Sequence, residues 1–365
     1  MNSLKRISFA LLIALLIHNG KLLSQNTSNS ITGYVKDAST GQPLLGVNVF
    51  ISGTYWGSTT NNDGYYEIVA VVPGTHEIVA SMVGYEPKVE PIIVKENRRS
   101  SVDFYLKAKT YDLDEVEVEA EVPEEWYDQL ELFKKYFLGT NDYAYDCTIE
   151  NEYEMEFEED DEFLKAFCDN SIIVINKALG FKIDCVLLDY KFNKETGGVQ
   201  YIVKPRFTEL KSTDPDIVKE WQENRREAFE GSLRHFLISL IRGAVIDEDF
   251  SLVSSIQRPS FGFHRGLDYS REIVNYVSST QFERLIDNAL KYDSTKAEYE
   301  FTIQRPWTID YWGWISILNL PFGSVTLDEY GYPKQLLGLD VYGRWADYGV
   351  ASMLPQYYEL KFYNE

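Results

Sequence analysis

Between Ile31 and Lys107 the chain breaks into short runs typical of β-strands, and their regular spacing constrains the fold more than any other feature. Turn residues that accept a positive φ at little steric cost, such as Gly53 and the triplet 62–64, separate the runs. Short strands joined by tight turns predict a seven-stranded β-sandwich over residues 31–107. The seven runs are ITGYVKDA, LGVNVFIS, YWGSTT, GYYEIVAV, GTHEIVASMV, PKVEPIIV and SVDFYLK.

Alternation within the second and fourth runs predicts which side chains share the core of the sandwich, because every second residue of a strand lies on one face. The residues expected there are Val47, Val49, Ile51, Tyr66, Ile68 and Ala70.

The stretch ITGYVKDASTGQPLLGVNVFISGTYWGSTTNNDGYYEI, continued by SMVGYEP, resembles the carboxypeptidase regulatory-like domain with its transthyretin-type sandwich. Exported proteins of Bacteroidetes often begin in this way. Such domains accompany peptidases, surface proteins and TonB-dependent receptors as accessory modules. The resemblance therefore implies a folding and docking module rather than an active site.

In the receptors this domain leads to a short segment that contacts TonB, and LDEVEVEA at residues 113–120 resembles that segment. Val116, Val118 and Ala120 alternate with acids, so the segment can add as a strand to the sheet of a partner. The alternative is an extra strand, or part of an acidic linker over residues 108–124.

Residues 1–24 predict a secretory signal peptide, since Lys5 and Arg6 precede a short apolar run at 7–17. This run falls below the ~20 residues that a membrane-spanning helix needs, and we expect no transmembrane span in the mature chain. We expect cleavage between Ser24 and Gln25. The protein is then exported, and resides in the periplasm, at the outer membrane or outside the cell.

The charge of the chain narrows the class of partner. Loss of the signal peptide removes Lys5, Arg6 and Lys21 but no acid, so the formal net charge falls from -22 to -25. Nucleic acid and anionic lipid require a basic face, which leaves an envelope protein, a peptide or a glycan as partner. Solubility is the simplest reason for the charge, and steering of a basic ligand or a cation is the alternative.

Longer elements follow residue 124 and predict an α+β domain with a mainly antiparallel sheet over 125–365. One helix is expected up to Gly139, and another from an Asp214 N-cap to Gly243 with a kink at 231–232. Expected strands are FKIDCVLLDYKF, VQYIVKPRF, AEYEFTIQR and YWGWISILN, with a hairpin in GSVTLDEYGYPKQLLGLDVYG. WQENRREAFEGSLRHFLISL and GRWADYGVASMLPQYY resemble a region of unknown function that follows the sandwich in some Bacteroidetes proteins.

Three cysteines, Cys147, Cys168 and Cys185, lie in this second part. An oxidising compartment permits one disulfide with one thiol left over, and three buried thiols are the alternative.

No common catalytic motif is present, and with four histidines, one of them in the signal peptide, we expect neither a metal site nor a cofactor. His235 is the one catalytic candidate, because GSLRHFL places it within a turn of Ser232 and Arg234. A hydrolase built on His235 is one hypothesis. A structural histidine at the edge of a core helix is the other.

The densest aromatic segment, RPWTIDYWGWISILNLPFG, predicts a binding surface. If it is one extended strand, Asp310, Trp312 and Trp314 lie on the face opposite Ile309 and Tyr311. Two indoles beside an acid form a platform for a sugar or a peptide, unless both faces are buried. The leading hypothesis is a non-enzymatic cell-envelope protein: an accessory β-sandwich fused to an α+β module that binds a partner or a glycan.

Overall fold

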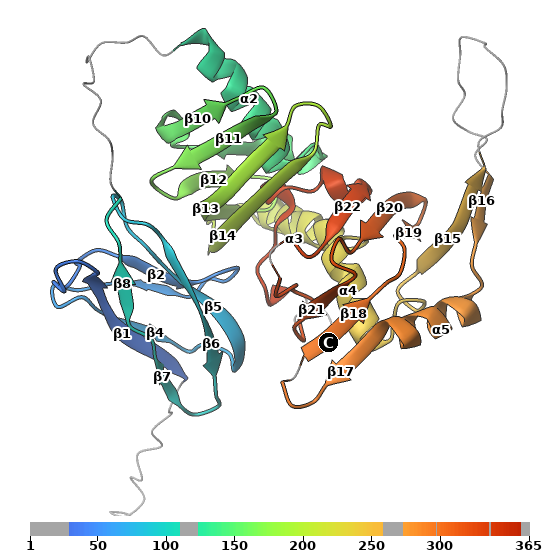
Figure 1. Ribbon diagram of the computed structural model, residues 1–365, viewed down its shortest axis with the longest axis horizontal. Coiled ribbons are helices and arrows are strands. Elements are labelled where there is room, and N and C mark those ends of the chain that lie inside the picture. Colours follow the sequence, from blue (N-terminus) through green and yellow to red (C-terminus); the bar gives the residue numbers. More distant parts are fainter. Residues whose placement is uncertain (1–28, 110–122, 258–272, 297, 336, 359–365) are drawn as a thin grey trace, which may run out of the picture.

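The computed structural model describes residues 29–109, 123–257, 273–296, 298–335 and 337–358. Three portions follow one another along the chain: a sandwich, a sheet covered by helix α2 (Glu124–Leu138), and a portion with two smaller sheets (Figure 1). The predicted signal peptide at 1–24 and the segment at 113–120 lie outside the described residues. No helix among the described residues combines the length and the apolar character needed to cross a membrane.

The sandwich has two four-stranded sheets, of order β4-β1-β7 with β8 also on β1, and β3-β2-β5-β6. It therefore has eight strands rather than the seven expected. The strands are β1 (Ser30–Asp37), β2 (Asn48–Ile51), β3 (Gly57–Thr59), β4 (Tyr65–Val69), β5 (Gly74–Ser81), β6 (Lys88–Val94), β7 (Arg99–Ser101) and β8 (Phe104–Leu106).

The extra strand arises because the last predicted run is interrupted opposite Gly33. β7 and β8 both pair with β1 in parallel, on either side of this break. A Cβ at Gly33 would lie 1.8 Å from the carbonyl oxygen of Val102. The Asp103 carboxylate accepts the Tyr34 N–H at 2.8 Å, so a side chain takes the place of a ladder bond and the strand divides.

The core of the sandwich follows the predicted alternation with one exception. Val47, Val49, Ile51, Tyr66 and Ile68 are all buried in one cluster. Ala70 is exposed at φ 59°, beyond the end of β4, so its predicted place in the core was wrong.

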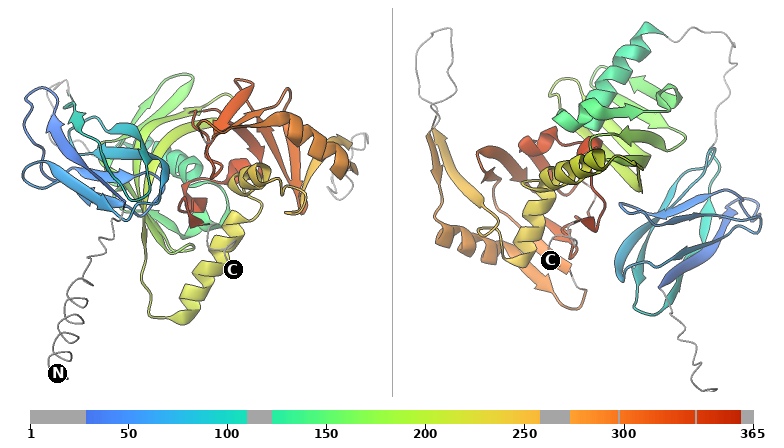
Figure 2. Two further views of the ribbon diagram at one scale, coloured as in Figure 1. Left: turned by 90° about the horizontal axis from the view of Figure 1, so that it is seen from below. Right: turned by 180° about the vertical axis from the view of Figure 1, so that it is seen from behind.

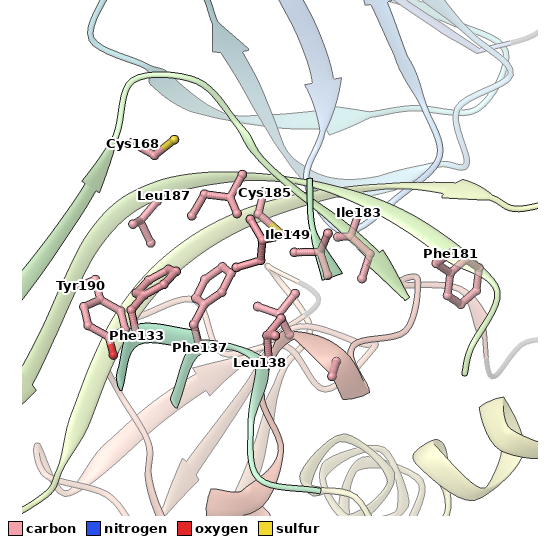
Figure 3. Close-up of a cluster of buried hydrophobic side chains, with 14 of the residues drawn as sticks. Phe133, Phe137, Leu138, Ile149, Cys168, Phe181, Ile183, Cys185, Leu187 and Tyr190 are labelled. Carbon is pink, nitrogen blue, oxygen red and sulfur yellow. The ribbon is translucent and has the colours of Figure 1, made fainter. Parts of the chain in front are cut away.

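The second portion is a six-stranded antiparallel sheet of order β10-β11-β13-β12-β9, with β14 on β13. Helix α2 covers one face of it and ends at Gly139, as predicted. Phe133 and Phe137 point from α2 toward Cys185, Leu187 and Tyr190 of the sheet (Figure 3). The strands are β9 (Cys147–Ile149), β10 (Met155–Glu159), β11 (Phe163–Cys168), β12 (Ile172–Asn176), β13 (Phe181–Asn193) and β14 (Val199–Glu209).

The long predicted helix is two helices, α3 (Pro215–Phe229) and α4 (Leu233–Arg242). Asp214 caps the first and Gly243, at φ 67°, ends the second, as predicted. The expected kink is a complete break, because Ser232 accepts the His235 N–H and starts a new helix. Figure 2 shows α3 projecting from the body at its N-terminal end, whereas α4 packs against the third portion.

The third portion contains a five-stranded sheet, β16-β15-β19-β20-β22, a three-stranded sheet, β17-β18-β21, and α5 (Ser279–Ala289). The run 323–343 turns back on itself as predicted, through an antiparallel bridge between Leu327 and Pro333, but β21 and β22 do not pair with each other: β21 pairs with β18, and β22 pairs with β20. Instead of one mainly antiparallel sheet, the described residues after position 123 form three antiparallel sheets. The strands are β15 (Phe250–Gln257), β16 (Ile273–Tyr276), β17 (Leu290–Asp293), β18 (Glu298–Thr302), β19 (Trp307–Tyr311), β20 (Trp314–Asn319), β21 (Ser324–Leu327) and β22 (Asp340–Gly343).

The sandwich contacts the second portion through the loop between β2 and β3, next to β14 (Figure 1). Thr54 forms a parallel bridge with Arg206, and its carbonyl accepts the Phe207 N–H at 2.9 Å. A small apolar cluster of Phe50, Val79 and Val186 seals the same contact.

The three cysteines are free thiols, which decides between the two alternatives. Burial raises the pKa of all three thiols, to about 11 for Cys168 and about 12 for Cys147. They therefore stay protonated and act as small apolar side chains.

Candidate binding site

The aromatic segment at 307–319 is a hairpin, and the single extended strand predicted for it was wrong. Tyr311 of β19 pairs with Trp314 of β20, and Trp312 and Gly313 form the two-residue turn. Both turn residues have positive φ, 52° and 89°, as a tight turn of this kind requires.

The hairpin separates the three predicted site residues. Trp312 is 74% exposed at the tip and Trp314 is 53% exposed. Asp310 is buried, and its carboxylate accepts the Gly313 N–H at 2.9 Å and the Tyr276 hydroxyl at 2.8 Å. Asp310 therefore fixes the turn, and the exposed platform is left to the two indoles.

Trp314 also lines a pocket of about 490 Å³ at the seam between the second and third portions. Tyr143 packs against the core of the second portion, whereas Tyr311 and Tyr348 pack against the core of the third. Seams between folding units are a common place for ligand sites. We call this the Trp314 pocket.

Arg344 fixes the aromatic wall of the Trp314 pocket. Its Cζ lies 4.1 Å from the centre of the Trp314 ring and 5.4 Å from that of Tyr348. A guanidinium over an aromatic face is attracted by the ring quadrupole, so the contact holds Trp314 in one orientation.

The polar wall comes from two short segments far apart in the sequence. The 3₁₀ helix η1 (Asp142–Asp146) supplies Asp142 and Asp146, and the last turn of α3 and its C-cap supply Glu227 and Glu230. Burial, and after it the charge of Glu227, raises the pKa of the Tyr143 hydroxyl to about 12. The pocket is thus acidic as well as aromatic.

Asn141 and Asn224 also line the pocket, and both side chains fasten its walls. Asn141 accepts the Tyr143 N–H at 3.0 Å and donates to the Ser352 hydroxyl and the Asp347 carbonyl. Asn224 donates to the Ala178 carbonyl at 2.9 Å. The walls are therefore held by bonds between segments remote in the sequence.

His235 is buried, and both of its ring nitrogens are engaged. Nδ1 accepts the Gly231 N–H at 3.0 Å, and Nε2 lies 3.2 Å from the Glu248 carboxylate. An acceptor at Nδ1 assigns the neutral tautomer with its proton on Nε2. The Ser232 hydroxyl caps α4 and accepts the backbone N–H of His235, so this contact does not pair the hydroxyl with the imidazole.

Through Gly231 the histidine supports the pocket. Gly231 lines the pocket at φ 72°, and a Cβ there would lie 2.4 Å from the Tyr311 ring. The Trp345 indole donates to the Gly231 carbonyl at 2.8 Å. These contacts fit the hypothesis that His235 is a structural histidine. Through Gly231, His235 helps to position one wall of the Trp314 pocket.

A larger pocket, of about 920 Å³, lies along α3 and residues 209–213. Its Trp221 indole donates to the Lys177 carbonyl, and Arg225 Nε donates to the Leu179 carbonyl. These side chains attach α3 to the turn between β12 and β13. The Trp314 pocket is the better candidate for a ligand because it lies between two portions and places an exposed indole beside carboxylates.

The aromatic residues around Trp314 predict its place in a binding surface, whereas no pattern in the sequence predicts the acidic wall. Residues 142–146 and 227–230 carry no shared pattern, and only the seam brings them together.

Comparison with known proteins identifies the first part of the chain. Residues 31–118 match the family model of the CarboxypepD_reg-like domain. TonB-dependent receptor P39 of Formosa agariphila is 37% identical over 109 residues, which is 30% of this chain and 10% of the receptor. TonB-dependent receptor SusC of Bacteroides thetaiotaomicron is 33% identical over 118 residues, 32% of this chain and 11% of the receptor. The chain thus spans about a tenth of the length of these receptors.

Solved structures give weaker likenesses. A DUF3823 family protein of Bacteroides ovatus has 13% identity and a TM-score of 0.17 over 50% of this chain and 83% of its own. A cohesin–X-dockerin complex of Acetivibrio cellulolyticus has 21% identity and a TM-score of 0.21 over 32% and 80%. Scores this low support no conclusion about the second part of the chain. Residues 31–118 carry a CarboxypepD_reg-like domain, joined to a second part that this family model does not reach.

Proposed function

We propose that this chain is an exported, non-enzymatic protein of the cell envelope that binds a glycan in the Trp314 pocket. The carrying observation is the lining of that pocket, where the exposed Trp314 ring stands beside tyrosines and carboxylates at the seam of two portions. Sugars present apolar C–H faces and many hydroxyls. Aromatic rings match the faces, and carboxylate oxygens accept from the hydroxyls.

The place in the envelope is supported by the first part of the chain. The two relatives that match 30% and 32% of this chain are named as TonB-dependent receptors. The predicted signal peptide at 1–24 agrees with that setting.

Titration calorimetry with a panel of neutral oligosaccharides tests the binding of glycans. Trp314→Ala should lose most of the affinity. Trp312→Ala is the matched control, because Trp312 is more exposed, sits in the same hairpin and does not line the pocket. Equal losses in the two variants would favour the flat platform instead, and binding untouched by either would end the proposal.

The hydrolase alternative rests on His235, whose contacts describe a buried, neutral imidazole. Hydrolysis assays on wild type and His235→Ala address it. If wild type hydrolyses a substrate and a folded His235→Ala variant loses nearly all of that activity, the hydrolase hypothesis is supported.

A second candidate function is docking to a TonB-type system through residues 113–120. It is favoured because the family match runs on to residue 118, beyond the sandwich. Deletion of 113–120 should abolish capture of TonB by the full chain and leave binding in the Trp314 pocket intact.

A further inference from the structure

We propose that the Trp314 pocket selects amino sugars with free, protonated amines over neutral and acidic sugars. This inference rests on the proposed function and names its class of ligand.

The charged side chains that line the pocket favour a cationic ligand over an anionic one. Asp142, Asp146, Glu227 and Glu230 line the pocket, and Arg344 is the only basic residue among its lining. The Glu230 carboxylate also lies 3.7 Å from Arg226 Nε, and this ion pair offsets part of its negative charge. A uronate or a sulfated sugar would meet like charges here, whereas an ammonium group is attracted.

The aromatic rings of the pocket also favour an ammonium group, because the faces of Trp and Tyr rings attract cations. The guanidinium of Arg344 at 4.1 Å from the Trp314 ring shows that this wall already holds one cation. A ligand ammonium placed against Tyr143 or Tyr311 would find the same attraction and would have carboxylates within the same cavity.

The negative net charge of the whole chain also favours a cationic ligand. A chain of formal net charge -22 raises the local concentration of cationic ligands and repels anionic ones. The mouth of the pocket adds to this field, since Asp142, Asp146, Glu227 and Glu230 are all exposed.

The test compares three probes in calorimetry on the full chain at pH 6: a glucosamine tetramer, its N-acetylated form and a galacturonate tetramer. Wild type should bind the free amine about tenfold more tightly than the N-acetylated form and should not bind the galacturonate. Salt should weaken binding of the amine far more than that of the N-acetylated form.

The variant Glu227→Gln/Glu230→Gln should lower the affinity for the amine far more than that for the N-acetylated tetramer, because the glutamine amide oxygens still accept from sugar hydroxyls whereas the negative charges are lost. Asp216→Asn/Glu220→Gln is the matched control, because both residues are exposed acids of the same helix outside the pocket and the same number of charges is removed. An equal effect of the control would place the preference in the overall charge and overturn the assignment to the pocket.

The remaining outcomes separate the inference from the proposed function. Equal binding of the amine and the N-acetylated tetramer, with both sensitive to Trp314→Ala, overturns the inference and leaves glycan binding standing. Absence of binding for all three probes overturns both. Tighter binding of an oligolysine peptide than of the glucosamine tetramer shows that the ligand is a peptide, and also overturns both.

Discussion

The backbone N–H of Gly53 donates to the carbonyl of Pro205 at 2.6 Å, so the loop between β2 and β3 extends the edge of the six-stranded sheet. On its other side the Gly53 carbonyl accepts the Gln356 N–H at 2.7 Å. The sandwich is thereby joined to two segments of the second part by main-chain hydrogen bonds, in the manner of an added strand.

This contact predicts that cutting the linker will not release the sandwich. Limited proteolysis should cut first within 108–124, which has few apolar side chains to bury. The two fragments should then separate on a denaturing gel but elute together from a native sizing column. Early cuts inside 31–107 would contradict the first half of the prediction, and separate native elution would contradict the second.

The ion pair between Lys204 and Glu77 gives a second prediction. The Lys204 ammonium is buried and lies 2.6 Å from the half-exposed Glu77 carboxylate across the contact with the sandwich. Glu77→Gln leaves a buried charge without its partner and should destabilise the protein by about 1 to 2 kcal/mol. Lys204→Met removes the buried charge and should cost less. Urea titrations of the two variants compare these costs, and an equal or reversed order would refute the argument.

Local turn chemistry explains why the sandwich could be predicted and the aromatic hairpin could not. The sequence Asn62-Asp63-Gly64 marks a turn by residue type, and β4 begins directly after it. Trp312-Gly313 forms an equally tight turn, yet tryptophan rarely adopts φ 52°. Only Gly313 hinted at the turn, so the segment looked like one continuous strand.

Non-local pairing explains the remaining differences. Whether β21 pairs with β22 or with β18 depends on which strand lies beside it, and nothing in the run from 323 to 343 encodes that choice. The acidic wall of the Trp314 pocket is of the same kind, because residues 142–146 and 227–230 meet only after the two portions pack.

The two buried histidines predict that the free energy of unfolding falls at acid pH. Burial lowers the pKa of His235 and His76, so the folded state favours their neutral forms. This contribution is complete above the unfolded pKa of about 6.5 and is lost as the pH falls below it, by up to about 1.4 kcal/mol per pH unit for each group. Asp328 partly offsets the loss, because burial raises its pKa to about 6 and the folded state gains from its protonation.

His235→Phe isolates one of these groups. Between pH 8 and pH 5.5 the free energy of unfolding of this variant should fall less than that of wild type. At pH 8 the variant should be about 1 to 3 kcal/mol less stable, because the Gly231 N–H loses its acceptor in a buried site. Urea denaturation at pH 5.5 and pH 8 measures both effects. An unchanged slope would show that His235 is not the titrating group.

The export prediction concerns the start of the chain. Intact-mass analysis of protein from an envelope fraction should give a species that begins near Gln25, because Lys5 and Arg6 precede a short apolar run. A mature species that retains Met1 would refute it.

The double variant Trp312→Ala/Trp314→Ala tests whether the hairpin serves binding or stability. At 74% and 53% exposure the two indoles bury little surface, so the variant should change stability by about 1 kcal/mol or less, mostly through loss of the contact between Trp314 and Arg344. A buried tryptophan would cost ~3 to 5 kcal/mol when truncated. A thermal melt distinguishes these values before any ligand is known. If the midpoint hardly moves while glycan affinity falls by about 1 to 3 kcal/mol, and if Trp314→Ala alone accounts for that loss, the ligand binds at the pocket wall rather than at the tip of the hairpin.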